Sequence, residues 1–238
     1  MRAHPAPTGP VLVVTAHPDD AEFAAGGTLA GWASAGAEIS LCVCTSGEAG
    51  EGPVAADELG ALRRAEQRAA AAALGIAAVT FLGYPDGRVE ADLGLRRDIT
   101  RVIRQVRPQR VLTHCPDPNW TRIQTTHPDH LAVGRATAAA VYPDSRNPGA
   151  HPELHAEGLA PWTVSELWLM TPPPAAENLA VDVTDDVEAK FSALAAHRSQ
   201  IADISALRTA ARFQMRQAAA RHELRGRVAE VFQVVRSS

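Results

Sequence analysis

The feature that most constrains the fold is a regular alternation of short apolar segments, rich in β-branched residues, with longer helical segments. Strands are expected at 11–16, 39–45, 79–82, 110–114 and 164–170, and helices at 26–35, 57–74, 93–106 and 128–141. Repeated strand–helix–strand units favour parallel strands, because each helix returns the chain to the sheet edge where the previous strand began. We therefore predict a Rossmann-like α/β fold, with a mostly parallel sheet and helices on both faces.

The chain of 238 residues suits one fairly large domain, and no linker or internal repeat divides it. We predict a single domain over 1–238, in which the proline-rich segment 1–9 is flexible. An edge strand is expected at 179–183, helices from 185 to 225, and a last strand or helix at 228–235. The region 142–161, which is rich in Pro, Gly and His, is expected to be an irregular surface loop.

Composition argues against several functional classes. Lys and Arg number 23 against 27 Asp and Glu, and the absence of a basic block argues against a nucleic-acid partner. No run approaches the roughly 20 apolar residues that a membrane helix needs, and the start of the chain does not resemble a signal peptide. Cys42, Cys44 and Cys115 are expected to be small buried residues of a reduced protein. These features predict a cytoplasmic protein without a membrane partner.

Two short motifs that lie far apart in the sequence look like halves of one metal site. His17-Pro18-Asp19-Asp20-Ala21-Glu22 follows the first expected strand, and His127-Pro128-Asp129-His130 opens the expected helix 128–141. Catalytic groups often follow a buried strand, because the strand fixes the backbone while the next loop stays open to substrate. Two imidazoles and one carboxylate would leave a coordination position free for water, as hydrolytic zinc requires.

We assign His17, Asp20 and His130 as ligands of Zn²⁺, although iron, manganese or cobalt would suit the same donors. Asp19 is expected to be the general base, which deprotonates the metal-activated water and passes the proton to the leaving amine. His127, held protonated by Asp129, would stabilise the oxyanion. The alternatives are that Asp19 and Asp20 cap a helix or bind magnesium, and that the second motif is a surface turn.

These motifs resemble those of the LmbE-like, or PIG-L, zinc-dependent deacetylases. Further matches extend over almost the whole chain and include Gly26-Gly27-Thr28, Thr45-Ser46-Gly47-Glu48, Leu82-Gly83-Tyr84-Pro85-Asp86-Gly87 and His197-Arg198-Ser199-Gln200. The resemblance implies the same ligands, base and oxyanion stabiliser. It also implies an enzyme that removes an N-acetyl group from an amino sugar or a related small metabolite, and a homo-oligomer.

Four residues are candidates for contact with the substrate. Arg63 matches a family position that contacts the sugar, and the alternative is a solvated helix arginine paired with Glu66. Glu48 and Asp86 are expected to line the pocket, with simple turn roles as the alternative. Trp120, in the long loop 115–126, is expected to flank the substrate or to pack against the protein.

Other residues limit the assignment. Thr125 stands where the mycothiol branch of the family has a tyrosine, so a sugar–thiol substrate is not supported. His114, His151 and His155 are assigned surface or structural roles, and His197 is assigned to shaping the site or a subunit contact. Two further functions stay open. One is a metal-dependent esterase or phosphoesterase, and the other is a non-catalytic sugar- or metal-binding module.

Overall fold

The computed structural model describes residues 6–52, 54–76 and 78–237, and within them seven strands form one sheet. The strand order is β3-β2-β1-β4-β5-β7-β6. The strands are β1 (Val11–Thr15), β2 (Ile39–Val43), β3 (Ala78–Phe81), β4 (Arg110–His114), β5 (Glu166–Met170), β6 (Leu179–Asp182) and β7 (Ala229–Arg236). Strands β1 to β5 run parallel to one another, and β7 pairs antiparallel with both β5 and β6. The prediction of a mostly parallel sheet is therefore confirmed.

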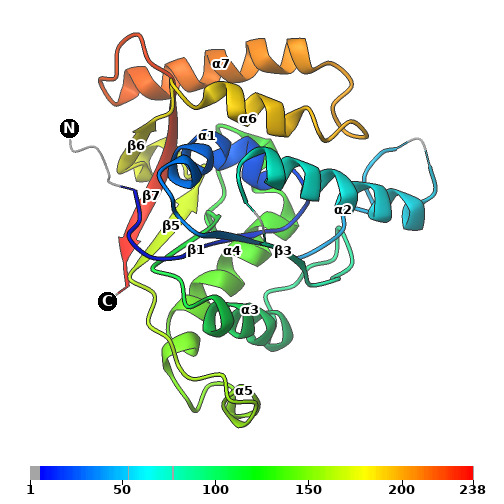
Figure 1. Ribbon diagram of the computed structural model, residues 1–238, viewed down its shortest axis with the longest axis vertical. Helices are drawn as coiled ribbons and strands as arrows, with labels where there is room; N and C mark the ends of the chain where they lie inside the picture. Colours follow the sequence, from blue (N-terminus) through cyan, green and yellow to red (C-terminus); the bar gives the residue numbers. More distant parts are fainter. Residues whose placement is uncertain (1–5, 53, 77, 238) are drawn as a thin grey trace.

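Helices cover both faces of this sheet (Figure 1). One face carries α1 (Asp20–Ser34), α2 (Ala56–Ala73), α6 (Val187–Leu194) and α7 (Ile204–Arg221). The other carries α3 (Leu93–Val106) and α4 (Pro128–Val141), with α5 (Pro152–Ala156) beyond them. Strand β1 explains this arrangement, because all five of its side chains are buried. Val11 and Val13 pack into the core beneath α1, whereas Leu12 and Val14 pack into the core beneath α3 and α4.

Two expectations about local structure are corrected. The region 142–161 is not an irregular surface loop, because it contains a short 3₁₀ helix and α5 around the buried Asp144. A buried carboxylate is costly without partners. Arg96 supplies two hydrogen bonds to Asp144, of 2.9 and 3.0 Å, and His151 lies 3.3 Å from it. Helix α1 also begins at Asp20 rather than Gly26, so the first metal motif lies at its N-terminus.

A buried ion pair joins α1 to α6 and β7. Lys190 of α6 lies 2.6 Å from Glu230 of β7, and both side chains are almost fully buried. Glu230 also accepts the backbone N–H groups of Gly27 and Thr28 in α1, at 3.0 and 2.8 Å. A Cβ atom at Gly26 would lie 2.9 Å from the Lys190 side chain, so glycine permits this close packing. The network fixes the helix whose first turn carries the site.

The order of the strands identifies where a ligand is expected. The chain leaves β1 toward β2 on one side, and β4 later returns on the other side of β1. The segments that follow β1 and β4 therefore diverge at the carboxyl edge of the sheet, which is where open α/β sheets bind ligands. The first metal motif follows β1 directly, and β4 ends at His114.

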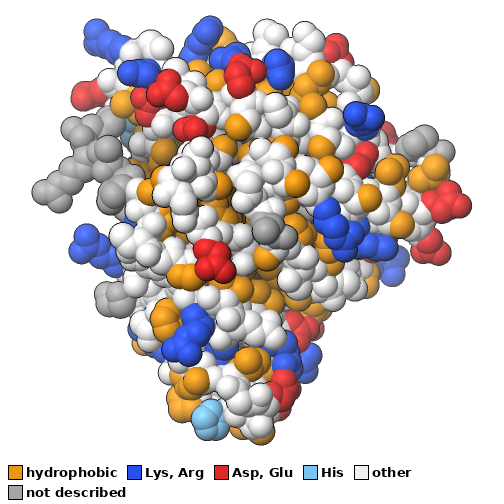
Figure 2. Space-filling model, in the orientation of Figure 1, with side chains coloured by type: hydrophobic (Ala, Val, Ile, Leu, Met, Phe, Trp, Pro, Cys, Tyr) orange, Lys and Arg blue, Asp and Glu red, His pale blue; other side chains and the backbone are white. Residues whose placement is uncertain are grey.

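Part of the N-terminal segment that was expected to be flexible is hydrogen-bonded to the rest of the chain. Residues 1–5 of the segment expected to be flexible lie outside the described residues, whereas Thr8 and Gly9 both donate backbone N–H groups to the Gln109 side chain. Among the described residues, no helix combines the length and apolar character needed to cross a bilayer. On the face shown in Figure 2, acidic and basic side chains are interspersed.

Candidate metal centre

The structure brings the three predicted metal ligands together. His17 follows β1, Asp20 begins α1, and His130 lies in the first turn of α4. His17 Nδ1 is 3.2 Å from His130 Nε2 and 3.5 Å from Asp20 Oδ2. The third side of this triangle joins His130 Nε2 to Asp20 Oδ1, at 3.1 Å.

These distances fit one metal ion. A tetrahedral zinc ion with bonds of about 2.0–2.1 Å separates its ligand atoms by about 3.3 Å. The two imidazole nitrogens lie 3.2 Å apart, and each lies 3.1 to 3.5 Å from one of the two Asp20 carboxylate oxygens, which is close to this spacing. Two imidazole nitrogens and one carboxylate oxygen are also a donor set that zinc uses when one position stays open. His17, Asp20 and His130 could therefore hold a metal ion such as zinc and leave a fourth position for a reactant.

The other nitrogen of His17 faces two carboxylates. His17 Nε2 lies 2.9 Å from Asp86 Oδ1 and 3.2 Å from Asp129 Oδ2. Asp129 is held in turn by the backbone N–H groups of Gly87 and Val89, at 2.8 and 3.2 Å. Histidines that bind metals commonly donate their second N–H to a carboxylate, which fixes the tautomer and the ring. The arrangement leaves the lone pair of Nδ1 directed at the donor cluster.

Three carboxylates surround the His17 imidazole. Burial alone would lower the pKa of His17, but hydrogen bonds to Asp129, Asp20 and Asp86 raise it to about 12. Three carboxylates around one ring thus require a positive charge near it. A divalent cation held by neutral imidazoles would supply that charge in place of the proton.

His114 is a member of the cluster that the sequence analysis assigned to a structural or surface role. It is the last residue of β4, and its Nε2 accepts the Ala16 backbone N–H at 3.1 Å and lies 3.2 Å from Asp20 Oδ2. Its ring stacks on that of His130, with centroids 4.0 Å apart. Burial lowers the pKa of His114 to about 4, so the ring is neutral and can accept the Ala16 hydrogen bond. The signal that could have identified it is its place at the end of a central strand.

The predicted base, Asp19, lies beside the ligands in a strained backbone conformation. Its φ of 89° is in the left-handed region, which costs a residue other than glycine about 1–2 kcal/mol. Two side chains from α2 hold this turn. Gln67 accepts the Asp19 backbone N–H at 2.8 Å, while Arg63 donates to the Pro18 carbonyl at 2.9 Å and to Asp19 Oδ2 at 3.2 Å. Burial and the Asp20 carboxylate raise the pKa of Asp19 to about 7, which suits a group that takes and returns a proton.

A buried polar chain continues behind Asp19. Gln67 donates to Glu22 Oε1 at 2.6 Å, and Glu22 Oε2 lies 3.6 Å from His197 Nε2. The Glu22 and His197 side chains are fully buried. His197 therefore lies behind the site, next to Glu22 but beyond hydrogen-bond distance from it, which is compatible with the predicted role in shaping the site. Glu22 and Gln67 were not assigned roles from the sequence, because only the folded chain shows their contacts.

The predicted relation between Asp129 and His127 is wrong. Asp129 was expected to hold His127 protonated, but its carboxylate contacts His17. The backbone N–H of Asp129 instead donates to His127 Nδ1 at 3.2 Å, because His127 caps the N-terminus of α4. Burial and the nearby His17 and His130 rings lower the pKa of His127. A neutral His127 carries its proton on Nε2, from which it can still donate a hydrogen bond.

The side chain of Arg63, which was predicted to contact substrate, forms hydrogen bonds with other residues of the protein. Besides its bonds to Pro18 and Asp19, its guanidinium donates to the Gly47 carbonyl at 2.8 Å, and the side chain is 6% exposed. The alternative pairing with Glu66 is also absent from the described contacts, since the Glu66 carboxylate accepts from Ser199 at 2.7 and 2.8 Å. Arg63 therefore positions the base and the loop after β2.

Glu48 and Asp86 connect neighbouring loops. Glu48 accepts the Asp86 backbone N–H at 2.9 Å, and Asp86 Oδ2 accepts the Ala49 backbone N–H at 3.0 Å. These bonds connect the loops that follow β2 and β3, and they direct Asp86 Oδ1 to His17. Both residues thus support His17, the predicted metal ligand, and their expected contact with substrate stays a prediction.

Trp120 lies at the rim of a cleft that leads to the donor cluster. Asp20, His114 and His130 line this cleft of about 740 Å³, together with residues 120–125. Trp120 is 76% exposed, so it does not pack into the core and is free to contact a bound molecule. A cavity of this size is within the range of small-molecule sites.

The α/β fold and the donor cluster together are those of a metal-dependent hydrolase with a Rossmann-like sheet. The family model described as PIG-L, GlcNAc-PI de-N-acetylase, matches residues 12–141. A 1D-myo-inositol 2-acetamido-2-deoxy-alpha-D-glucopyranoside deacetylase of Rhodococcus erythropolis is 34% identical, over 80% of this chain and 81% of the relative. The chain belongs to the PIG-L family.

Solved structures agree with this placement. An N,N'-diacetylchitobiose deacetylase from Pyrococcus horikoshii is 28% identical, with a TM-score of 0.86 over 95% of this chain and 83% of that one. The 4-carboxy-2-hydroxymuconate hydratase GalB from Pseudomonas putida has a TM-score of 0.78 at 23% identity, over 96% of both chains. Because the second likeness shows the fold alone, the reaction must be argued from the site.

Proposed function

We propose that this chain is a zinc-dependent N-deacetylase that removes an acetyl group from an N-acetylated amino sugar or a related small metabolite. The observation that carries the proposal is the triangle of His17, Asp20 and His130 donor atoms, with Asp19 beside it and a cleft leading to it. The relatives from Rhodococcus and Pyrococcus are both named as deacetylases of N-acetylated sugars, which supports the same reaction.

In the proposed reaction the metal ligands and Asp19 have separate roles. A zinc ion bound by the three ligands would polarise the amide carbonyl and lower the pKa of water. Asp19 takes the proton from the attacking water and returns it to the leaving nitrogen, so that the C–N bond breaks to give an amine and acetate. Its pKa of about 7 keeps both forms accessible at neutral pH. Arg63 and Gln67 hold Asp19 in place for both transfers.

His127 is placed to stabilise the oxyanion. Its ring centroid lies 4.9 Å from that of His17 and 5.3 Å from that of His130, so it borders the donor cluster. Since Nδ1 accepts the Asp129 N–H, the Nε2–H is free to donate to the carbonyl oxygen as negative charge develops there. Asp129 and Asp86 orient His17 through Nε2 and are positioning residues.

Acetate release tests the proposal. The zinc-loaded protein is expected to release acetate from N-acetylglucosamine or N,N'-diacetylchitobiose, and chelation of zinc should abolish this release, with recovery on adding zinc back. Parallel assays with p-nitrophenyl acetate and p-nitrophenyl phosphate address the alternative enzyme class. Turnover of the ester or phosphate with no acetate from any amide would contradict the deacetylase proposal, and no turnover at all would favour a binding module.

We also propose a cellular compartment and an oligomeric state for this protein. The three cysteines are unpaired and buried, which supports a reducing compartment such as the cytoplasm. A homo-oligomer is proposed from the family resemblance, and light scattering of the purified protein would test it.

A further inference from the structure

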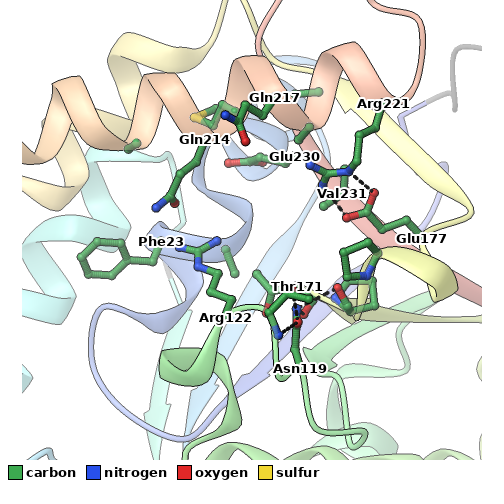
Figure 3. Close-up of a pocket in the computed structure, with 18 of the residues that line it drawn as sticks. Phe23, Asn119, Arg122, Thr171, Glu177, Gln214, Gln217, Arg221, Glu230 and Val231 are labelled. Carbon is green, nitrogen blue, oxygen red and sulfur yellow. Dashed lines mark hydrogen bonds and ion pairs between the residues drawn. The ribbon is translucent and has the colours of Figure 1, made fainter.

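A second cavity continues the metal-centre cleft away from the ligands. It has a volume of about 480 Å³ and lies between the loop at 119–122, the segment after β5, and α7 (Figure 3). Both cavities are lined by Phe23, Ala24, Thr121, Arg122, Thr171 and Gln214. The two spaces therefore form one groove, in which a molecule held at the zinc ligands can extend beneath α7. Each cavity alone has the size of a small-molecule site.

Arg122 stands at the junction of the two cavities. In Figure 3 its side chain extends from the loop toward Phe23 and Gln214, which line the same space. Arg122 is an exposed residue that lines both cavities, and none of the described residues forms an ion pair or hydrogen bond with its guanidinium. Burial lowers the pKa of Arg122, and no carboxylate among the described residues offsets this effect. An arginine that lines a cavity and has no internal partner is available to bind an anionic group of a ligand.

The other charged groups of the second cavity already have partners. Glu177 lies 2.6 Å from Arg221, and Lys190 lies 2.6 Å from Glu230. In each pair the two charges neutralise one another, so within the described lining of the second cavity Arg122 supplies a positive charge that no carboxylate offsets. A guanidinium presents a planar set of N–H donors that matches the two oxygens of a carboxylate or of a phosphate.

We propose that the preferred substrate is an N-acetylated compound that extends past the metal centre and carries an anionic oxygen group, a carboxylate or a phosphate, which Arg122 binds. The proposal rests on the proposed deacetylase function and makes Arg122 a specificity-determining residue. Gln214, on the facing helix α7, would add an amide donor and acceptor for neighbouring hydroxyl groups.

Three substrates that differ in charge test this role. They are N-acetylglucosamine, which is neutral, N-acetylmuramic acid, which adds a carboxylate, and N-acetylglucosamine 6-phosphate. The wild-type enzyme is expected to have its highest kcat/KM for one of the two anions, which also identifies the anionic group. Arg122→Gln should lower kcat/KM for that anion by about 10- to 100-fold, the range expected for loss of a hydrogen bond to a charged group, and should change kcat/KM for the neutral substrate by no more than about twofold.

The matched control is Arg216→Gln, which alters an exposed arginine of α7 that lines neither cavity.

The outcomes separate this inference from the function on which it rests. If Arg122→Gln lowers kcat/KM equally for all three substrates, or if neither anion is preferred, the anion role is wrong although the deacetylase function stands. If no substrate releases acetate, the proposed function is contradicted. Isothermal titration of the same three compounds then decides the role of Arg122. A loss of at least tenfold in affinity for an anion in Arg122→Gln supports the role, and equal affinities in wild type and variant overturn it.

Discussion

Replacing Asp19 by Asn is expected to lower kcat for acetate release by about 10²- to 10⁴-fold while zinc content is unchanged. Asparagine has nearly the same shape and can still accept from Arg63, but it cannot take a proton from water or return one to the leaving nitrogen. Steady-state kinetics with acetate detection, together with metal analysis of the same preparations, would measure both effects.

A matched control is available on the surface. Asp57→Asn makes the same chemical change at an exposed position in the first turn of α2 and should leave kcat unchanged. A zinc-loaded Asp19→Asn enzyme with nearly full activity would remove Asp19 from the role of general base.

Replacing His130 by Ala is expected to weaken zinc binding by more than about 100-fold. Loss of a residue that merely supports a metal ligand already costs about 10- to 100-fold in affinity, so loss of a ligand should cost more. His130 Nε2 forms two sides of the donor triangle, with His17 and Asp20. Competition between the apoprotein and a chromophoric chelator would give the dissociation constants of wild type and variant.

His155→Ala provides the comparison for this experiment. His155 is an exposed histidine in α5, which lies beyond α3 and α4 from the sheet (Figure 1). Its loss should not alter zinc affinity. Wild-type affinity in the His130 variant would exclude this histidine from the metal site.

The parts of the fold that could be predicted are those with strong local signals. Helix α3 begins and ends at the predicted residues, because the Asp92 side chain caps its N-terminus and Arg107 before Pro108 ends it in a left-handed conformation. The buried run of β1 was recognised from its unbroken apolar character, which is typical of a central parallel strand. A motif that follows such a strand has its position set by the strand, so the proximity of His17 and Asp20 followed from the local sequence.

The parts that could not be predicted depend on contacts between distant segments. Arg63, Glu48 and Asp86 lie in three separate segments, and nothing local indicates that their charged groups join the loops around the site. The carboxylate of Asp129 turns to His17 because the backbone of Gly87 and Val89 meets it there. Such long-range hydrogen bonds decide which polar residues remain free for a ligand.

Anomalous diffraction above the zinc edge, from crystals of the zinc-loaded protein, tests most directly whether one ion unites the two motifs. We expect a single peak within about 2.0–2.2 Å of His17 Nδ1, His130 Nε2 and one Asp20 oxygen. A peak placed instead between His17 Nε2, Asp86 and Asp129, which also form a possible donor group, would contradict the assignment, as would the absence of any peak.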